Sequence, residues 1–298
     1  MTVSDVLEPV ASLDVPLEDI SGAEVVMSRT GREMLWLVSE TDAVALVSEV
    51  GKDGIPGTWR RIPLSECDGG SAAMFHSMEA VTVDGLGRLV VLTENPPRVA
   101  LVDPADRWVA ACASLVVTGK FPRTRRTWGV DSTVKGEGVL LLQDGHLLVA
   151  KERSPVVWGE WGPESHFPMG LSRETLLGDD EGWAPPPDRL VLLHRWTLQP
   201  DPGGETLTDV SDMSVGPDGR IWVISEKDRR IGRLPQLMSP ETETVHLDGL
   251  WALGGARTKH PEGLAIGRNG TIYVARDTKK PKGNLLVYRP VDTMEDCV

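Results

Sequence analysis

A two-strand motif recurs along this chain, and its recurrence constrains the fold more than any other feature. Each copy is a short apolar run, a turn that contains glycine, and a second apolar run. Asp-Gly or Asn-Gly, which are strong hairpin signals, stands in three of the turns. Four copies align without gaps, and the first copy along the chain has a longer hairpin. The five copies span residues 21–42, 77–95, 136–154, 210–228 and 261–279.

A weaker pair of strands follows each copy, and units of four strands at this spacing are typical of β-propeller blades. We therefore predict an all-β chain, with residues 1–298 forming a single five-bladed β-propeller; a six-bladed ring is the alternative. Only one further strand, NLLVYRP, follows the last copy. The stretch around residues 7–17 resembles outer strands elsewhere in the chain. We expect it to complete the last blade and close the ring.

Two connections between the expected strands are unusually long, residues 118–133 and residues 159–188. Loops of this length are uncommon in compact domains unless they serve a function. We expect them to form walls or lids of a site; decoration of the fold is the alternative.

Charge and cysteine content narrow the choice of partners. The chain has 44 acidic and 31 basic residues, a net charge of −13, which disfavours nucleic acid and anionic membranes. No apolar segment is long enough to span a membrane, and the first residues do not read as a signal peptide. Three widely spaced cysteines form neither a disulfide framework nor a metal clip. We expect a cytoplasmic protein whose partner is a small-molecule substrate or ligand.

Carboxylates recur at one place in the hairpins, with pairs fifteen residues apart such as Glu79 and Glu94. The beginning of a hairpin's first strand lies beside the end of its second, so both positions are expected at one mouth of the propeller channel. The inner set is Glu79, Glu137 and Glu262, with Ser21, Ser211 and Asp212 at the equivalent places. The outer set is Glu40, Glu94, Glu152, Glu226 and Asp277.

So many carboxylates cannot all be ionised in one mouth without a counter-charge, because like charges raise one another's pKa. Either a hard cation binds there or the carboxylates share protons. Oxygen ligands in a wide ring favour Ca²⁺, with Mg²⁺ as the alternative. The expected metal ligands are Glu79, Glu137, Glu262 and Asp212. In the competing interpretation, the carboxylates only accept backbone hydrogen bonds.

The sequence thus suggests a cation-dependent enzyme, a hydrolase or lyase that acts on a small polar substrate at the mouth. The expected catalytic acid and base are among Glu94, Glu152 and His76. Expected substrate-binding residues are Glu40, Glu226, Asp277, Arg125, Arg126, Trp128 and His260. The two arginines would hold an anionic group, although a basic surface loop is the alternative. A non-catalytic binding propeller, stabilised by its metal, is the competing function.

The segments GEGVLLLQDGHLLVAKERSP, DVSDMSVGPDGRIWVISEKDRRIGRL and HPEGLAIGRNGTIYVARD resemble the SdiA-regulated (YjiK-like) β-propeller family. The resemblance implies a propeller with a calcium ion at the channel mouth, and no settled reaction. Glu79, Glu137 and Glu262 match the family's acidic position, and Ser21 and Ser211 match its Ser-Gly variant. Two features depart from the family. Asp212 stands where the family often has glycine, and the membrane anchor of YjiK-like members is lacking, which argues against an envelope location.

Overall fold

The fold is all-β in a computed structural model of the chain. The structure describes residues 6–64, 75, 77–94, 97–105, 108–117, 136–151, 153–178, 180–200, 204–255 and 258–291. These residues form 22 strands and one short 3₁₀ turn, Gln143–Gly145. Within the same ranges, no helix is long and apolar enough to cross a membrane.

Most strands fall into five antiparallel units. Unit 1 contains β3 (Ile20–Met27), β4 (Glu33–Ser39), β5 (Val44–Glu49) and β6 (Arg60–Pro63). Unit 2 contains β7 (Met78–Val83), β8 (Leu89–Thr93), β9 (Arg98–Asp103) and β10 (Trp108–Val116). Unit 3 contains β11 (Gly136–Leu141), β12 (Leu147–Lys151), β13 (Val157–Gly162) and β14 (Arg189–Leu198). Unit 4 contains β15 (Asp212–Val215), β16 (Ile221–Ser225), β17 (Arg230–Arg233) and β19 (Gly249–Leu253). Unit 5 contains β20 (Pro261–Ile266), β21 (Ile272–Arg276) and β22 (Leu285–Tyr288).

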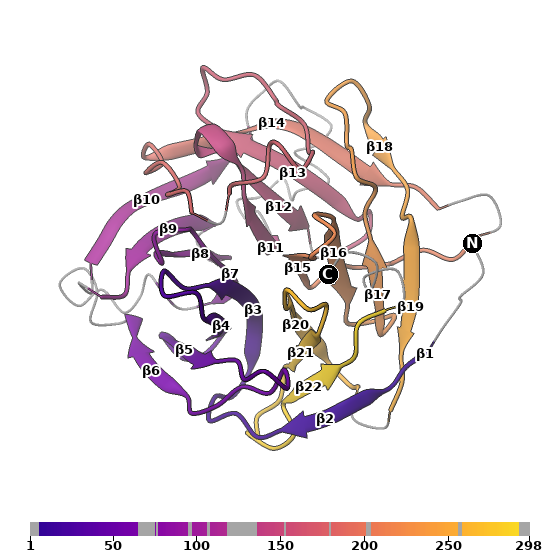
Figure 1. The fold of residues 1–298 in the computed structure, drawn as a ribbon. Helices are drawn as coiled ribbons and strands as arrows, with labels where there is room; N and C mark the ends of the chain where they lie inside the picture. The colour runs from indigo at the N-terminus through magenta and orange to yellow at the C-terminus, as the bar shows by residue number, and fades with distance from the viewer. Residues whose placement is uncertain are drawn as a thin grey trace.

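The first strands of the five units meet around a common centre (Figure 1). Strand β3 contacts β7, β7 contacts β11, β11 contacts β15, β15 contacts β20, and β20 returns to β3. Units 2 and 3 also share a sheet, because β10 and β14 pair in parallel at the periphery, and the short β18 (Thr244–Val245) extends that sheet. This radial arrangement of antiparallel units is β-propeller-like.

The hydrophobic core is divided among the interfaces between neighbouring units. Alternate residues of a strand point to opposite faces of its sheet, so each unit contributes apolar side chains to the unit before it and to the unit after it. Five buried clusters result, one at each interface. Representative pairs are Trp36 and Val91, Leu92 and Trp161, Trp158 and Met213, Trp222 and Leu286, and Tyr273 and Leu37.

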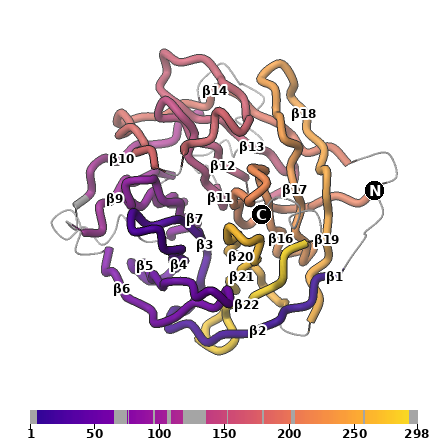
Figure 2. The backbone as a smooth tube through the Cα atoms, viewed as in Figure 1, coloured from indigo at the N-terminus to yellow at the C-terminus, as the bar shows by residue number. Residues whose placement is uncertain are grey.

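The N-terminal segment completes the last unit, as the sequence predicted. Strand β2 (Pro9–Leu13) pairs antiparallel with β22, the last strand of unit 5 along the chain. The preceding strand β1 (Val6–Leu7) pairs in parallel with β19 of unit 4 (Figure 2). One short segment therefore links two units and covers the outer edges of both sheets.

Asn284 fixes this closure, and replacing it should destabilise the protein. Its side chain is fully buried; Oδ1 accepts the Val15 N–H at 2.8 Å, and Nδ2 donates to the Val15 and Leu17 carbonyls at 3.1 and 2.7 Å. We expect Asn284→Ala to lower the free energy of unfolding by about 2–4 kcal/mol, because buried backbone groups lose their partners.

Urea unfolding measures this loss. The matched control is Asn269→Ala, in which a surface turn loses one bond to the Thr271 N–H; its cost should stay below about 1 kcal/mol. Equal losses in the two variants would show that Asn284 does not stabilise the closure.

Candidate functional site

Four of the first strands carry a β-bulge at the predicted inner position. The register shifts between Ile20 and Gly22 in β3, and at the equivalent places in β7, β11 and β20. The residues left without a cross-strand partner are Ser21, Glu79, Glu137 and Glu262. A bulge redirects a side chain out of the regular alternation, and bulges are frequent beside active sites.

The residue after each bulge is small because neighbouring first strands approach closely. A Cβ atom on Gly22 would lie 2.9 Å from the Ala80 Cα, and one on Gly138 would lie 3.0 Å from the Met213 nitrogen. A Cβ atom on Gly263 would lie 3.2 Å from the Ala23 nitrogen. This close approach brings the bulged positions of adjacent units toward one another at the channel mouth.

Asp212 occupies the equivalent small-residue position in unit 4, and its carboxylate links three units. Its Oδ2 accepts the Ala23 N–H of unit 1 at 3.1 Å and the Leu264 N–H of unit 5 at 2.8 Å. Its Oδ1 accepts the N–H of Met213 at 2.8 Å, and the residue is only 1% exposed. Burial raises the pKa of Asp212 well above its usual value, against the effect of these hydrogen bonds. In the structure, the carboxylate of this predicted metal ligand therefore accepts hydrogen bonds from backbone amides.

Five of the predicted carboxylates form one electrostatic cluster around Glu262, called here the mouth cluster. Burial raises the pKa of Glu262 to about 9, and repulsion from four other carboxylates adds to this effect. The members of the mouth cluster are Glu262, Asp277, Glu226, Glu79 and Glu40, which come from units 1, 2, 4 and 5. The sequence missed Asp19. Burial and then a hydrogen bond to Asp19 raise the pKa of Asp277.

Three residues with left-handed backbone hold the outer positions beside the inner ones. Asp19, Ser77 and His260 have φ values of 46°, 57° and 53°, and each stands two residues before an inner position. The carbonyls of these three residues accept the N–H groups of Glu40, Glu94 and Asp277 at 3.0, 3.1 and 3.0 Å respectively. Non-glycine residues rarely adopt this conformation, and such strain clusters at functional sites.

Glu226 and His260 form a pair across the boundary between units 4 and 5. The Nδ1 atom of His260 lies 2.7 Å from Oε1 of Glu226, and both side chains are partly exposed. The Glu226 N–H donates to the Ser211 hydroxyl at 3.3 Å. Two residues predicted to bind substrate are therefore a carboxylate–imidazole pair at the mouth.

Other predicted site residues are not members of the mouth cluster as defined here, or lie outside the described residues. The Ser21 hydroxyl is buried and donates to the Met78 carbonyl at 2.6 Å, which links units 1 and 2. Glu94 and Glu137 occupy the equivalent positions in units 2 and 3, but they are not among the carboxylates that raise the pKa of Glu262. Outside the described residues lie His76, Glu152 and the whole connection 118–133, which includes Arg125, Arg126 and Trp128.

The described mouth residues do not form a metal site as they are arranged. Within the described ranges, no three His, Cys, Asp or Glu side chains are placed to hold one metal ion. Both oxygens of Asp212 accept backbone N–H groups, and Glu226 contacts His260. Of the two arrangements that the sequence allows, shared protons fit this geometry, and the Ca²⁺ site stays a prediction.

No known family model and no curated protein matches the chain. The resemblance to the SdiA-regulated family therefore stays an expectation. Among solved structures, virginiamycin B lyase from Staphylococcus aureus is 11% identical over 96% of this chain and 75% of that one, with a TM-score of 0.39. A gluconolactonase from Xanthomonas campestris is 12% identical over 92% and 77%, with a TM-score of 0.43. The aldose sugar dehydrogenase of Streptomyces coelicolor is 10% identical over 96% and 98%, with a TM-score of 0.44. None of these likenesses bears on the chemistry of this chain.

Proposed function

We propose that the chain is a five-bladed propeller whose mouth cluster is an acid–base site for hydrolase or lyase reactions on a small polar substrate. The closed cycle of first-strand contacts and the five core clusters support five blades over six. The observation that carries the acid–base assignment is the gathering of five carboxylates from four units at one end of the channel.

Glu262 is the proton donor in this proposal. With a pKa of about 9, it holds its proton at neutral pH, as a general acid must. The bulge in β20 redirects this side chain out of the sheet alternation. The sequence assigned Glu262 to a metal; in this proposal its protonated carboxyl is the acid when no cation is bound.

The Glu226–His260 pair is the base. A carboxylate bonded to Nδ1 fixes the imidazole ring, so that Nε2 is the nitrogen that exchanges a proton with the substrate. An acid from unit 5 and a base that joins units 4 and 5 can then act on one bond, either to activate water or to remove a proton for elimination.

A substrate screen tests this proposal. The panel contains lactones, carboxylate esters, phosphate monoesters and β-hydroxy acids, and wild type is expected to turn over at least one class. Glu262→Gln should then lower kcat by about 100-fold or more. The control is Glu49→Gln, which removes an exposed ion pair with Arg32 and should leave turnover unchanged.

Two results would overturn the assignment. One is native turnover by Glu262→Gln. The other is a panel with no turnover at all, which would favour the non-catalytic binding propeller.

We also propose that Ca²⁺, with Mg²⁺ as the alternative, competes with protons for the mouth cluster. Deprotonated, its five carboxylates offer only oxygen ligands and strong negative charge, which attract hard dications. At about pH 8, about 5 mM Ca²⁺ should raise the Tm by about 2–4 °C over sodium chloride of equal ionic strength. Glu79→Gln should reduce this shift. An identical Tm in Ca²⁺, EDTA and sodium chloride would contradict the cation proposal and leave the acid–base proposal standing.

A further inference from the structure

A cavity of about 530 Å³ lies at the end of the channel opposite the mouth cluster. Its walls include the last residues of the first strands, among them Val26, Val83, Leu141, Val215 and Ile266. The mouth cluster lies where these strands begin, so about 10–15 Å of strand separates the two sites. The cavity volume is within the range of small-molecule sites.

The long connection between β13 and β14 forms one wall of this cavity. Leu177 donates its N–H to the Leu141 carbonyl at 3.1 Å, and the Gln143 N–H donates to the Thr175 carbonyl at 2.9 Å. Leu171 and Met238 exchange backbone hydrogen bonds at 3.0 and 2.9 Å. The connection is thus bonded to units 3 and 4, and the wall or lid predicted from sequence is a fixed wall at this end.

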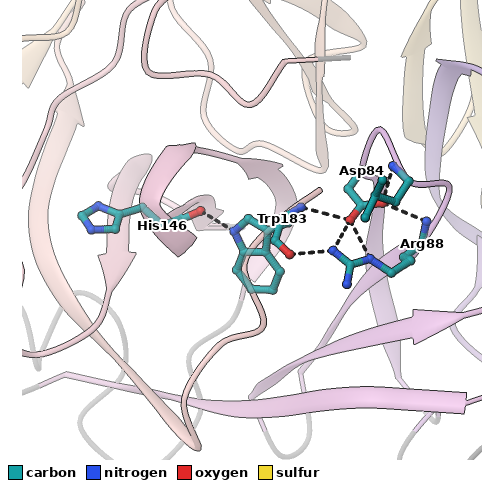
Figure 3. A network of polar contacts seen from close by, with 5 residues as sticks. Asp84, Arg88, His146 and Trp183 are labelled. Atoms are coloured by element: carbon teal, nitrogen blue, oxygen red, sulfur yellow. Dashed lines mark hydrogen bonds and ion pairs between the residues drawn. The ribbon is translucent and has the colours of Figure 1, made fainter. Parts of the chain in front are cut away.

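A polar network around Trp183 attaches the same connection to units 2 and 3 (Figure 3). Trp183 is fully buried; its backbone N–H donates to Asp84 at 3.0 Å and its Nε1 to the His146 carbonyl at 3.1 Å. Arg88 donates to the Trp183 carbonyl and to Asp84, both at 2.6 Å. Asp84 lines the cavity, but Arg88 balances its charge.

The other charged side chains that line the cavity differ in how exposed they are. Glu24 is deep, with 8% exposure, and Glu33 is half-buried. Arg173 and Arg268 are exposed at the rim. The Arg268 N–H donates to Glu33 at 2.6 Å. Arg173 packs over the turn of unit 4, where its Cδ lies 3.3 Å from the position of a Cβ on Gly219. The cavity therefore offers one deep carboxylate, Glu24, and a second carboxylate, Glu33, beside the guanidinium groups near the rim.

We propose that this cavity binds a small zwitterion, an α-amino acid or a short peptide with free ends. The ammonium group enters toward Glu24 and Glu33, and the carboxylate stays at the rim with Arg173 and Arg268. A zwitterion carries one group of each sign, so it can make charge-assisted hydrogen bonds both to the carboxylates and to the guanidinium groups of this lining.

Saturation-transfer NMR on the full chain tests this proposal. The probe is an equimolar pool of the twenty α-amino acids and trialanine, and at least one member should receive saturation. N-acetylation or C-terminal amidation of that member should each weaken binding about tenfold or more.

Matched variants locate the ligand. Arg173→Ala should weaken binding about tenfold, and Glu24→Gln should do the same. Arg189→Ala removes an exposed ion pair with Glu164 and should change nothing. Because Arg173 is exposed, its replacement tests the site even if Glu24→Gln fails to fold. Three results would each overturn the proposal. They are a pool in which no member receives saturation, unaltered binding of the acetylated and amidated forms, and full affinity in Arg173→Ala. None of these results depends on the mouth cluster.

Discussion

Replacing Glu262 by glutamine is expected to make the protein more stable than wild type at alkaline pH. Burial and four neighbouring carboxylates raise the pKa of Glu262 from 4.5 to about 9 in the folded chain. Below pH 4.5, both the folded and the unfolded state hold this proton, so Glu262 does not lower the free energy of unfolding. As the pH rises toward 9, the unfolded state releases a proton that the folded state retains, so wild type loses stability. Glutamine mimics the protonated acid and avoids this loss, which is on the order of 3–6 kcal/mol.

Urea unfolding in EDTA between about pH 5 and about pH 9 measures this effect. The free energy of unfolding of wild type should fall across that range, and that of Glu262→Gln should fall by several kcal/mol less. Glu49→Gln, whose carboxylate is in an exposed ion pair, should follow wild type. Parallel curves for wild type and Glu262→Gln would mean that Glu262 is ionised in the folded protein.

Replacing Asp212 by alanine is expected to cause the largest loss of stability among single changes in the channel. Three backbone N–H groups from units 1, 4 and 5 would lose their acceptor in a site that water does not reach. The cost should be about 3 kcal/mol or more, at about 1–3 kcal/mol for each of the three buried unsatisfied groups.

Ser214 provides the matched control, because it lies in the same strand and accepts one N–H, from Ile266, at 3.2 Å. Ser214→Ala should cost about 1 kcal/mol. Asp212→Asn keeps the shape of the side chain but only one acceptor oxygen. Its loss of stability should lie between those of Asp212→Ala and Ser214→Ala. Equal melting of Asp212→Ala and Ser214→Ala would show that Asp212 does not hold the units together.

Strand order was predictable because it depends on local patterns. The Asp-Gly and Asn-Gly turns and the apolar runs on both sides of them predict the hairpins, and the missing last strand predicts the pairing of β2 with β22. The parallel pairing of β1 with β19 was not predictable, because two residues carry no pattern. The bulges also escaped prediction, since a fifteen-residue spacing identifies the end of a hairpin but not the direction of a side chain.

The candidate site was predictable in location and less so in chemistry. The sequence grouped Asp212 with the carboxylates of the mouth. However, Asp212 stands where the other units have glycine or alanine, so its side chain must enter the channel between strands. The His260 pairing needs two units in contact, which no spacing reveals. The position of the cavity wall could have been deduced. The connection 159–188 follows a third strand, which ends where its hairpin turns, opposite the mouth cluster.

The pH titration of the Glu262 side-chain carboxyl shows whether this group holds a proton at neutral pH. Carbon-13 NMR follows this carboxyl, and the signal lost in Glu262→Gln assigns it. We predict a midpoint near pH 9. A midpoint near 4.5, the ordinary value for glutamate, would contradict it, because Glu262 would then carry no proton to donate at neutral pH.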